Sequence, residues 1–163
     1  MTKMFEVNIY LETSLKGPTV RDGWCASVLE YTSKAGKTET REDFVVQTAT
    51  TYHRQCVCAL LKSLKRLNAS CTVNVYTDSI YLKNGIEDYI KTWKANGWIN
   101  AKGEEIKNVK EWKEIARLIS GQKIIFHWIK RHKYTEWMMK TAKEYPVGIF
   151  ESKNKAVKPR EIQ

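Results

Sequence analysis

The stretch VNVYTDSIYLKNGI, residues 73–86, decides the fold of this chain of 163 residues. Its first five residues alternate between apolar and polar side chains, which is the period of a β-strand. The alternation stops at Asp78, and helical spacing follows, with a break expected at residues 84–85. A carboxylate at such a strand-to-helix junction either caps the helix or holds a metal ion.

Three strands are predicted before this stretch. In MFEVNIYLETS (residues 4–14) the apolar side chains of Phe5, Val7, Ile9 and Leu11 face one way, and the strand ends at Glu12. WCASVLEYTS (24–33) and KTETREDFVVQT (37–48) are strand segments that meet in a turn near residues 34–37. After residue 51 the apolar residues recur at helical spacing up to residue 67.

The second half of the chain alternates helices with a strand. Helical character resumes through residues 86–93, a polar glycine-containing excursion covers 94–108, and VKEWKEIARLI (109–119) is a helix. KIIFHWI (123–129) is a continuous apolar run, which predicts a strand covered on both faces. YTEWMMKTAKEY (134–145) is a last helix.

This order predicts an α/β fold with a five-stranded mixed sheet, three antiparallel strands followed by two helix-linked strands, flanked by helices. We expect one domain over residues 1–147 and a basic tail over 148–163.

Composition limits the partners and the compartment. The net charge is +10, and residues 123–163 carry ten basic and four acidic side chains. Such a balance favours nucleic acid as the first partner and an acidic membrane as the second. No apolar run spans a bilayer and no signal peptide is recognised, so we expect a cytoplasmic protein. The four cysteines have no zinc-site spacing and are interpreted as reduced, mostly buried thiols.

The block YTDSIYLKNGIEDYIKTWKANGWINAKGEEIKNVKEWKEI (residues 76–115) resembles the ribonuclease HI family. The resemblance extends over about residues 7–145. It includes small ribonuclease H-like proteins of bacterial mobile elements, some of which have E-T-S where the enzymes have D-G-S. It implies an RNase H-like fold, binding of RNA–DNA hybrid, and hydrolysis by two Mg²⁺ or Mn²⁺ ions that four carboxylates hold.

Only two of those four carboxylates are found. Asp78 is retained in T-D-S, and Glu12 stands where the family has the first-strand aspartate. Cys56, or Gln55 after a shift of one residue, occupies the helix position of the glutamate. The last-helix aspartate falls within residues 139–142, which carry no acid, and Glu136 and Glu144 are interpreted as surface acids. The predicted metal ligands are therefore Glu12 and Asp78, with Mg²⁺ or Mn²⁺ bound weakly or not at all.

The resemblance also suggests residues that contact nucleic acid. These are Arg54, the basic protrusion with Lys91, Lys94, Trp98, Lys102 and Lys107, and the loop residues Lys130 and Arg131. The alternative interpretation of Trp93, Trp98 and Trp112 is packing. His132 aligns with the family's loop histidine and is predicted as catalytic together with Glu12 and Asp78, although a surface histidine is the alternative.

Three functions follow from these residues. The leading hypothesis is a ribonuclease H-like protein that binds RNA–DNA hybrid or duplex and has weak or lost cleavage. The alternative is an active metal-dependent hybrid endoribonuclease with a third acid, Glu136 or Glu144. The second alternative is a protein-interaction module, for which exposed apolar groups near residues 134–139 would argue. The sequence identifies no particular protein partner.

Overall fold

The structure is a computed structural model that describes residues 5–144 and, for the backbone, residues 156–157. Its sheet contains β1 (Phe5–Thr13), β2 (Arg21–Thr32), β3 (Thr38–Thr50), β4 (Cys71–Thr77), β5 (Lys123–Trp128) and the two-residue β6 (Ala156–Val157). The strand order is β5-β4-β1-β2-β3-β6. β1, β2 and β3 pair antiparallel, and β4 pairs parallel with both β1 and β5. The predicted five-stranded mixed sheet is confirmed, and β6 adds a short strand beside β3.

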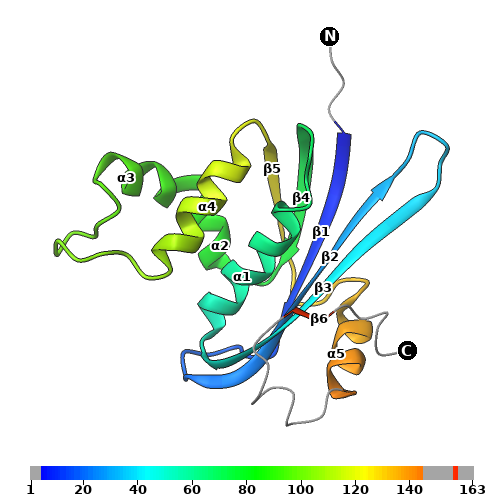
Figure 1. The fold of residues 1–163 in the computed structure, drawn as a ribbon, viewed down its shortest axis with the longest axis horizontal. Helices are drawn as coiled ribbons and strands as arrows, with labels where there is room; N and C mark the ends of the chain where they lie inside the picture. Colours follow the sequence, from blue (N-terminus) through cyan, green and yellow to red (C-terminus); the bar gives the residue numbers. More distant parts are fainter. Residues whose placement is uncertain (1–4, 145–155, 158–163) are drawn as a thin grey trace.

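Helices cover both faces of this sheet (Figure 1). One side carries α1 (Tyr52–Leu64), α2 (Ile80–Asn84), the π-helical turn η1 (Gly85–Tyr89), α3 (Ile90–Ala95) and α4 (Val109–Ile119). The other side carries α5 (Thr135–Lys143). The larger core cluster lies between the sheet and the α1–α4 side, and a smaller one lies under α5.

The alternation predicted for the first strand is confirmed with one exception. Val7, Ile9 and Leu11 are buried against the α1 side, while Tyr10 belongs to the cluster under α5. Phe5, which the period placed in the core, is 59% exposed at the first residue of β1.

The prediction that residues 123–129 form a strand covered on both faces is wrong. β5 is the last strand of the sheet on its side, and its side chains are half-buried or exposed. Trp128 is 54% exposed. An apolar run gives no information on whether a second strand lies beyond it, so periodicity does not separate an edge strand from a central one.

The break expected at residues 84–85 is a π-helical turn rather than an end of the helix. A side chain at Gly85 would put its Cβ 2.2 Å from the ring of Trp112, so only glycine lets α4 approach this closely. Trp112 is fully buried and donates its indole N–H to the hydroxyl of Tyr81 at 2.8 Å. The close contact between the two segments therefore fixes the base of the protrusion.

A buried carboxylate, Glu30, ties α5 and the loop before it to the sheet. It accepts hydrogen bonds from Tyr134 at 2.7 Å and from Asn8 at 3.0 Å, and it pairs with Lys133 at 2.5 Å. Burial opposes ionisation, but the bonds from Lys133, Tyr134 and Asn8 prevail and lower the pKa of Glu30 below its ordinary 4.5. Because the folded-state pKa is lowered, this stabilisation is present above about pH 4.5 and is lost as pH falls through the folded-state pKa.

We expect Glu30→Gln to lower the free energy of unfolding at neutral pH by about 1.5–3 kcal/mol, the worth of hydrogen bonds to a charged group. Urea unfolding at about pH 7 and about pH 3 tests this, since the difference from the wild type should shrink in acid. Glu87→Gln, which removes an exposed pair with Lys83, is the control and should cost about 0.5 kcal/mol at most. An undiminished difference at the lower pH would contradict the assignment.

Two further expectations concern the chain ends and the compartment. Apart from β6, the predicted basic tail of residues 148–163 lies outside the described residues, and its separation from a domain of 1–147 stays a prediction. Within the described residues, no helix is both long enough and apolar enough to traverse a bilayer. A cytoplasmic location stays a prediction.

Candidate functional site

Two acidic side chains meet where two neighbouring parallel strands end. Tyr10 of β1 is paired in register with Tyr76 of β4, and Glu12 and Asp78 each follow two residues later. Because β1 and β4 are parallel, residues that follow their carboxyl ends lie at the same edge of the sheet. Glu12 and the strand-to-helix junction predicted at Asp78 therefore lie side by side. Glu12 is 6% exposed, and the side chain of Asp78 is 23% exposed.

The ammonium group of Lys16 lies between these two carboxylates. Its Nζ is 2.5 Å from Oε1 of Glu12 and 3.0 Å from Oδ2 of Asp78. Partial burial opposes the charge of Lys16, but Glu12 and then Asp78 more than compensate and raise its pKa above the ordinary 10.5. Lys16 is therefore protonated at neutral pH and supplies a positive charge at the junction.

Asp78 has further donors. Its Oδ1 accepts a hydrogen bond from the hydroxyl of Tyr52 at 2.6 Å, and its backbone carbonyl accepts one from the indole N–H of Trp128 at 3.0 Å. The interpretation of Asp78 as a helix cap is wrong. The N-cap of α2 is Ser79, whose hydroxyl accepts from the backbone N–H of Leu82.

The helix position predicted to have lost its acid is next to Asp78. Cys56 is buried in α1, and burial raises the pKa of its thiol to about 12. It is therefore a neutral thiol, a poor ligand for Mg²⁺. The alternative residue, Gln55, is fully buried and is occupied with Leu15 and Ser14, where it holds the loop after β1 against α1.

The last helix brings no carboxylate to the site. Met139 and Ala142 of α5, the two ends of the segment predicted to have lost the aspartate, line a pocket together with Glu12. Glu136 is 89% exposed and pairs with Arg131 at 3.3 Å, and Glu144 is exposed. Neither acid belongs to the lining of this pocket.

The residues at this junction do not fit a pair of divalent ions. Two carboxylates replace the four of the predicted site, and a lysine ammonium is already bonded to both. Among residues 5–144, no three His, Cys, Asp or Glu side chains come together as a metal site would require. A magnesium ion would have to displace Lys16 and accept an incomplete ligand set, although Mg²⁺ prefers near-ideal octahedral geometry.

His132, predicted as catalytic, is held by the backbone through both ring nitrogens. Nε2 lies 2.8 Å from the carbonyl of Leu11, and Nδ1 accepts from the backbone N–H of Tyr134 at 3.2 Å. Burial lowers the pKa of His132, although the bond to Leu11 opposes the effect. In this arrangement the ring is neutral at pH 7 and has no free nitrogen for proton transfer to a ligand.

Of the residues predicted to contact nucleic acid, one is bonded to other side chains of the protein and six are exposed cations. Arg54 donates to Asn108 at 3.0 Å and pairs with Glu111 at 3.3 Å, so it also links α1 to α4. The lysines of the protrusion and the loop cations are exposed: Lys91, Lys94, Lys102, Lys107, Lys130 and Arg131.

The tryptophans of the protrusion pack against one another. The rings of Trp93 and Trp112 lie 5.3 Å apart edge to face, and Trp98 lies 6.4 Å from Trp93 with the ammonium of Lys113 over its ring. All three have the packing role that was the alternative interpretation. Trp98 is half-buried.

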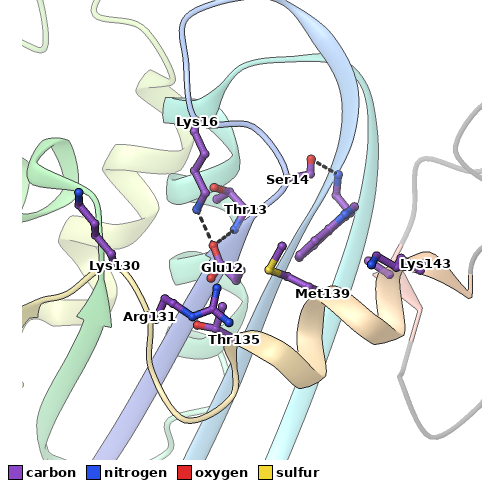
Figure 2. Close-up of a pocket in the computed structure, with 11 residues that line it drawn as sticks. Glu12, Thr13, Ser14, Lys16, Lys130, Arg131, Thr135, Met139 and Lys143 are labelled. Carbon is purple, nitrogen blue, oxygen red and sulfur yellow. Dashed lines mark hydrogen bonds and ion pairs between the residues drawn. The ribbon is translucent and has the colours of Figure 1, made fainter.

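Two pockets share Lys16 as a lining residue. The first, of about 430 Å³, extends from Glu12 towards α5 (Figure 2). The second, of about 420 Å³, lies towards the protrusion and has an aromatic wall of Tyr52, His53, Tyr81 and Trp93. The surface around the two acids is thus hollowed on both the helix α5 side and the protrusion side.

The sequence interpretation missed Lys16 and Trp128. The signal for Lys16 was available, because the residue stands four positions after Glu12 in LKGP, where Gly17 and Pro18 turn the chain. Trp128 carried no such signal, since its contact with Asp78 joins residues 50 positions apart.

Comparison with known proteins identifies a family. The profile of the RNase H family matches residues 5–141. Ribonuclease H of Cupriavidus pinatubonensis is 38% identical over 129 residues, which cover 79% of this chain and 85% of that protein. Ribonuclease H of Legionella pneumophila strain Corby is 39% identical over 127 residues, or 78% of this chain and 85% of that protein.

Solved structures share the fold. LC9-RNase H1, described as a type 1 RNase H with the type 2 active-site motif, superposes with a TM-score of 0.71 at 20% identity over 99% of this chain and 82% of its own. The foamy viral protease-reverse transcriptase in complex with RNA/DNA hybrid gives a TM-score of 0.56 at 15% identity over 76% of this chain and 17% of its own. The expected RNase H-like fold is therefore confirmed.

Proposed function

This chain belongs to the RNase H family, and we propose that it binds RNA–DNA hybrid or duplex nucleic acid and cleaves the hybrid weakly or not at all. The observation that carries this proposal is the bridge from Lys16 to both Glu12 and Asp78. A cation that belongs to the protein takes the place at which two dications would act. The reaction that depends on those ions then loses its nucleophile and its stabilised leaving oxygen.

The binding part of the proposal rests on charge and shape. The exposed lysines of the protrusion lie on α3 and on the loop before α4, away from the sheet (Figure 1). Exposed ammonium groups contact phosphate oxygens without reading the base sequence. The aromatic wall of the second pocket adds surface for sugars and bases between this protrusion and the junction of β1 and β4.

We expect Lys94→Ala/Lys107→Ala to weaken hybrid binding at low salt. Each lost phosphate contact should lower the slope of log K against log salt by about 1, so the double variant should lower it by about 2. Fluorescence anisotropy with a labelled hybrid at several salt concentrations measures both effects. Lys34→Ala/Lys37→Ala, on the exposed β2–β3 turn, removes the same charge and should leave the slope unchanged. Equal slopes for both variants would contradict a role of the protrusion.

The cleavage part is tested with the same labelled hybrid in the presence and absence of Mn²⁺. We expect binding without appreciable cleavage in both conditions. Robust Mn²⁺-dependent cleavage that Asp78→Asn abolishes would overturn this part of the proposal and establish the active endoribonuclease instead. Failure to retain hybrid at any salt concentration would overturn the binding part.

A further inference from the structure

The first pocket differs in character from the rest of the junction. Its volume of about 430 Å³ falls in the range of about 300–1,000 Å³ that small-molecule sites occupy. The end of β1 forms one wall, Trp24 of β2 another, and Thr135, Met139 and Ala142 of α5 a third. The loop residues Lys130 and Arg131 also line the pocket.

Positive charge dominates this lining. It contains Lys16, Lys130, Arg131 and Lys143 but a single acid, Glu12, which already pairs with Lys16. Within residues 5–144, Lys130 and Lys143 have no ion-pair partner, and Arg131 has one exposed contact, to Glu136. Exposed pairs of this kind contribute little, so the three outer cations remain available to an anion.

Because no carboxylate stands at the last-helix position, the α5 wall of the pocket is positively charged instead of negatively charged. Where the family resemblance places an aspartate, the pocket presents the thioether of Met139 and, one turn further along α5, the ammonium of Lys143. A dication is repelled by such a wall. Arginine and lysine together favour a phosphate, which Arg holds through two parallel hydrogen bonds and Lys as a point charge.

A phosphate alone would leave much of the pocket unused. Met139 is 44% exposed, and the half-buried Trp24 also lines the pocket. In the view of Figure 2, Met139 lies between Arg131 and Lys143, and all three side chains line the pocket. Thioethers and indoles pack favourably on the flat face of a nucleobase.

We propose that this pocket is a nucleotide site, in which a base packs on Met139 and Trp24 while its phosphate contacts Arg131 and Lys143. The shared chemistry is the phosphate monoester of a nucleoside, and it has two sources, a free mononucleotide or the phosphorylated end of a strand. The site lies on the α5 side of Glu12, separate from the protrusion that the proposed duplex binding uses.

Methionine-methyl NMR tests the proposal with a built-in control. With [¹³C-methyl]methionine protein, adenosine monophosphate should shift the Met139 signal in a saturable way and leave that of the fully buried Met138 nearly unchanged. Adenosine and inorganic phosphate, each alone, should bind at least tenfold more weakly. Equal shifts from inorganic phosphate and adenosine monophosphate would overturn the nucleotide assignment, as would the lack of any Met139 shift with both the mononucleotide and a 5′-phosphorylated oligonucleotide.

Oligonucleotides with a 5′-phosphate or a 5′-hydroxyl distinguish a phosphorylated strand end from a free mononucleotide as the ligand. Preference for the 5′-phosphate with little binding of the mononucleotide assigns the site to strand ends, and tight binding of the mononucleotide assigns it to free nucleotides. Indifference of the Met139 signal to the 5′-phosphate, together with no response to the mononucleotide, contradicts both.

Charge reversal provides the matched variant. Arg131→Glu/Lys143→Glu should weaken the binding of adenosine monophosphate at least tenfold. Lys34→Glu/Lys37→Glu makes the same change in net charge on the distant turn and should leave this affinity unchanged. If both variants weaken the binding of the mononucleotide equally, the effect comes from net charge and the proposed site is refuted. Anisotropy of the labelled hybrid under the same conditions shows separately whether duplex binding holds.

Discussion

We expect Lys16→Met to raise the affinity of the protein for Mn²⁺ by about tenfold or more, equivalent to at least about 1.4 kcal/mol of binding free energy. In the wild type, Mn²⁺ has to displace an ammonium that Glu12 and Asp78 both bind. Methionine has a similar length and no charge. Its introduction leaves two carboxylates of like charge close together, an arrangement that a divalent cation stabilises.

Calorimetric titration at low ionic strength measures this change, and the increase in Tm with added Mn²⁺ checks it, because an ion that binds only the folded state stabilises it. Lys37→Met, at an exposed turn, is the control for loss of one positive charge and should match the wild type. Adding Asp78→Asn to Lys16→Met should remove the gain.

The same affinity in Lys16→Met and the wild type would refute the view that Lys16 competes with metal ions. Cleavage should stay low in this variant even with Mn²⁺ bound, since one ion on two carboxylates does not clamp the leaving oxygen. Metal affinity and hydrolysis are therefore expected to separate.

We expect Trp112→Ala to lower the free energy of unfolding by about 3–5 kcal/mol, the range for removing a large aromatic side chain from a core. Trp112 is fully buried, packs on Gly85, and hydrogen-bonds to Tyr81. Its loss leaves a cavity between the π-helical turn and α4 and an unpaired Tyr81 hydroxyl. The protrusion that carries the exposed lysines is built on this contact.

Urea unfolding followed by circular dichroism measures the loss without relying on tryptophan fluorescence. Ile80→Ala, at the start of the neighbouring helix and 47% exposed, is the control and should cost about 0.5 kcal/mol. A loss below about 1 kcal/mol for Trp112→Ala would mean that the two segments collapse onto the cavity, contrary to the close packing at Gly85.

The five main strands and their class were predictable because each has a local signature. The alternation in β1 and the helical spacing of α1 reflect which side of each element is buried. The spacing of apolar residues along the sequence shows this directly. The resemblance then gave the positions of Glu12, Asp78 and Cys56, and the structure places all three around one junction. The edge position of β5 was not predictable, because an apolar run has the same sequence pattern whether or not a further strand pairs with it.

The sequence by itself determined the fold family and led to the prediction that two of the four expected carboxylates are missing, because both depend on residue identity and local periodicity. Only the tertiary structure decided what surrounds the two that remain. Lys16 returns to Glu12 through a turn and reaches Asp78 across 62 positions, and Tyr52 meets Asp78 from another helix. Charges act through space, so the sign of the potential at this site depends on distances that no stretch of sequence contains.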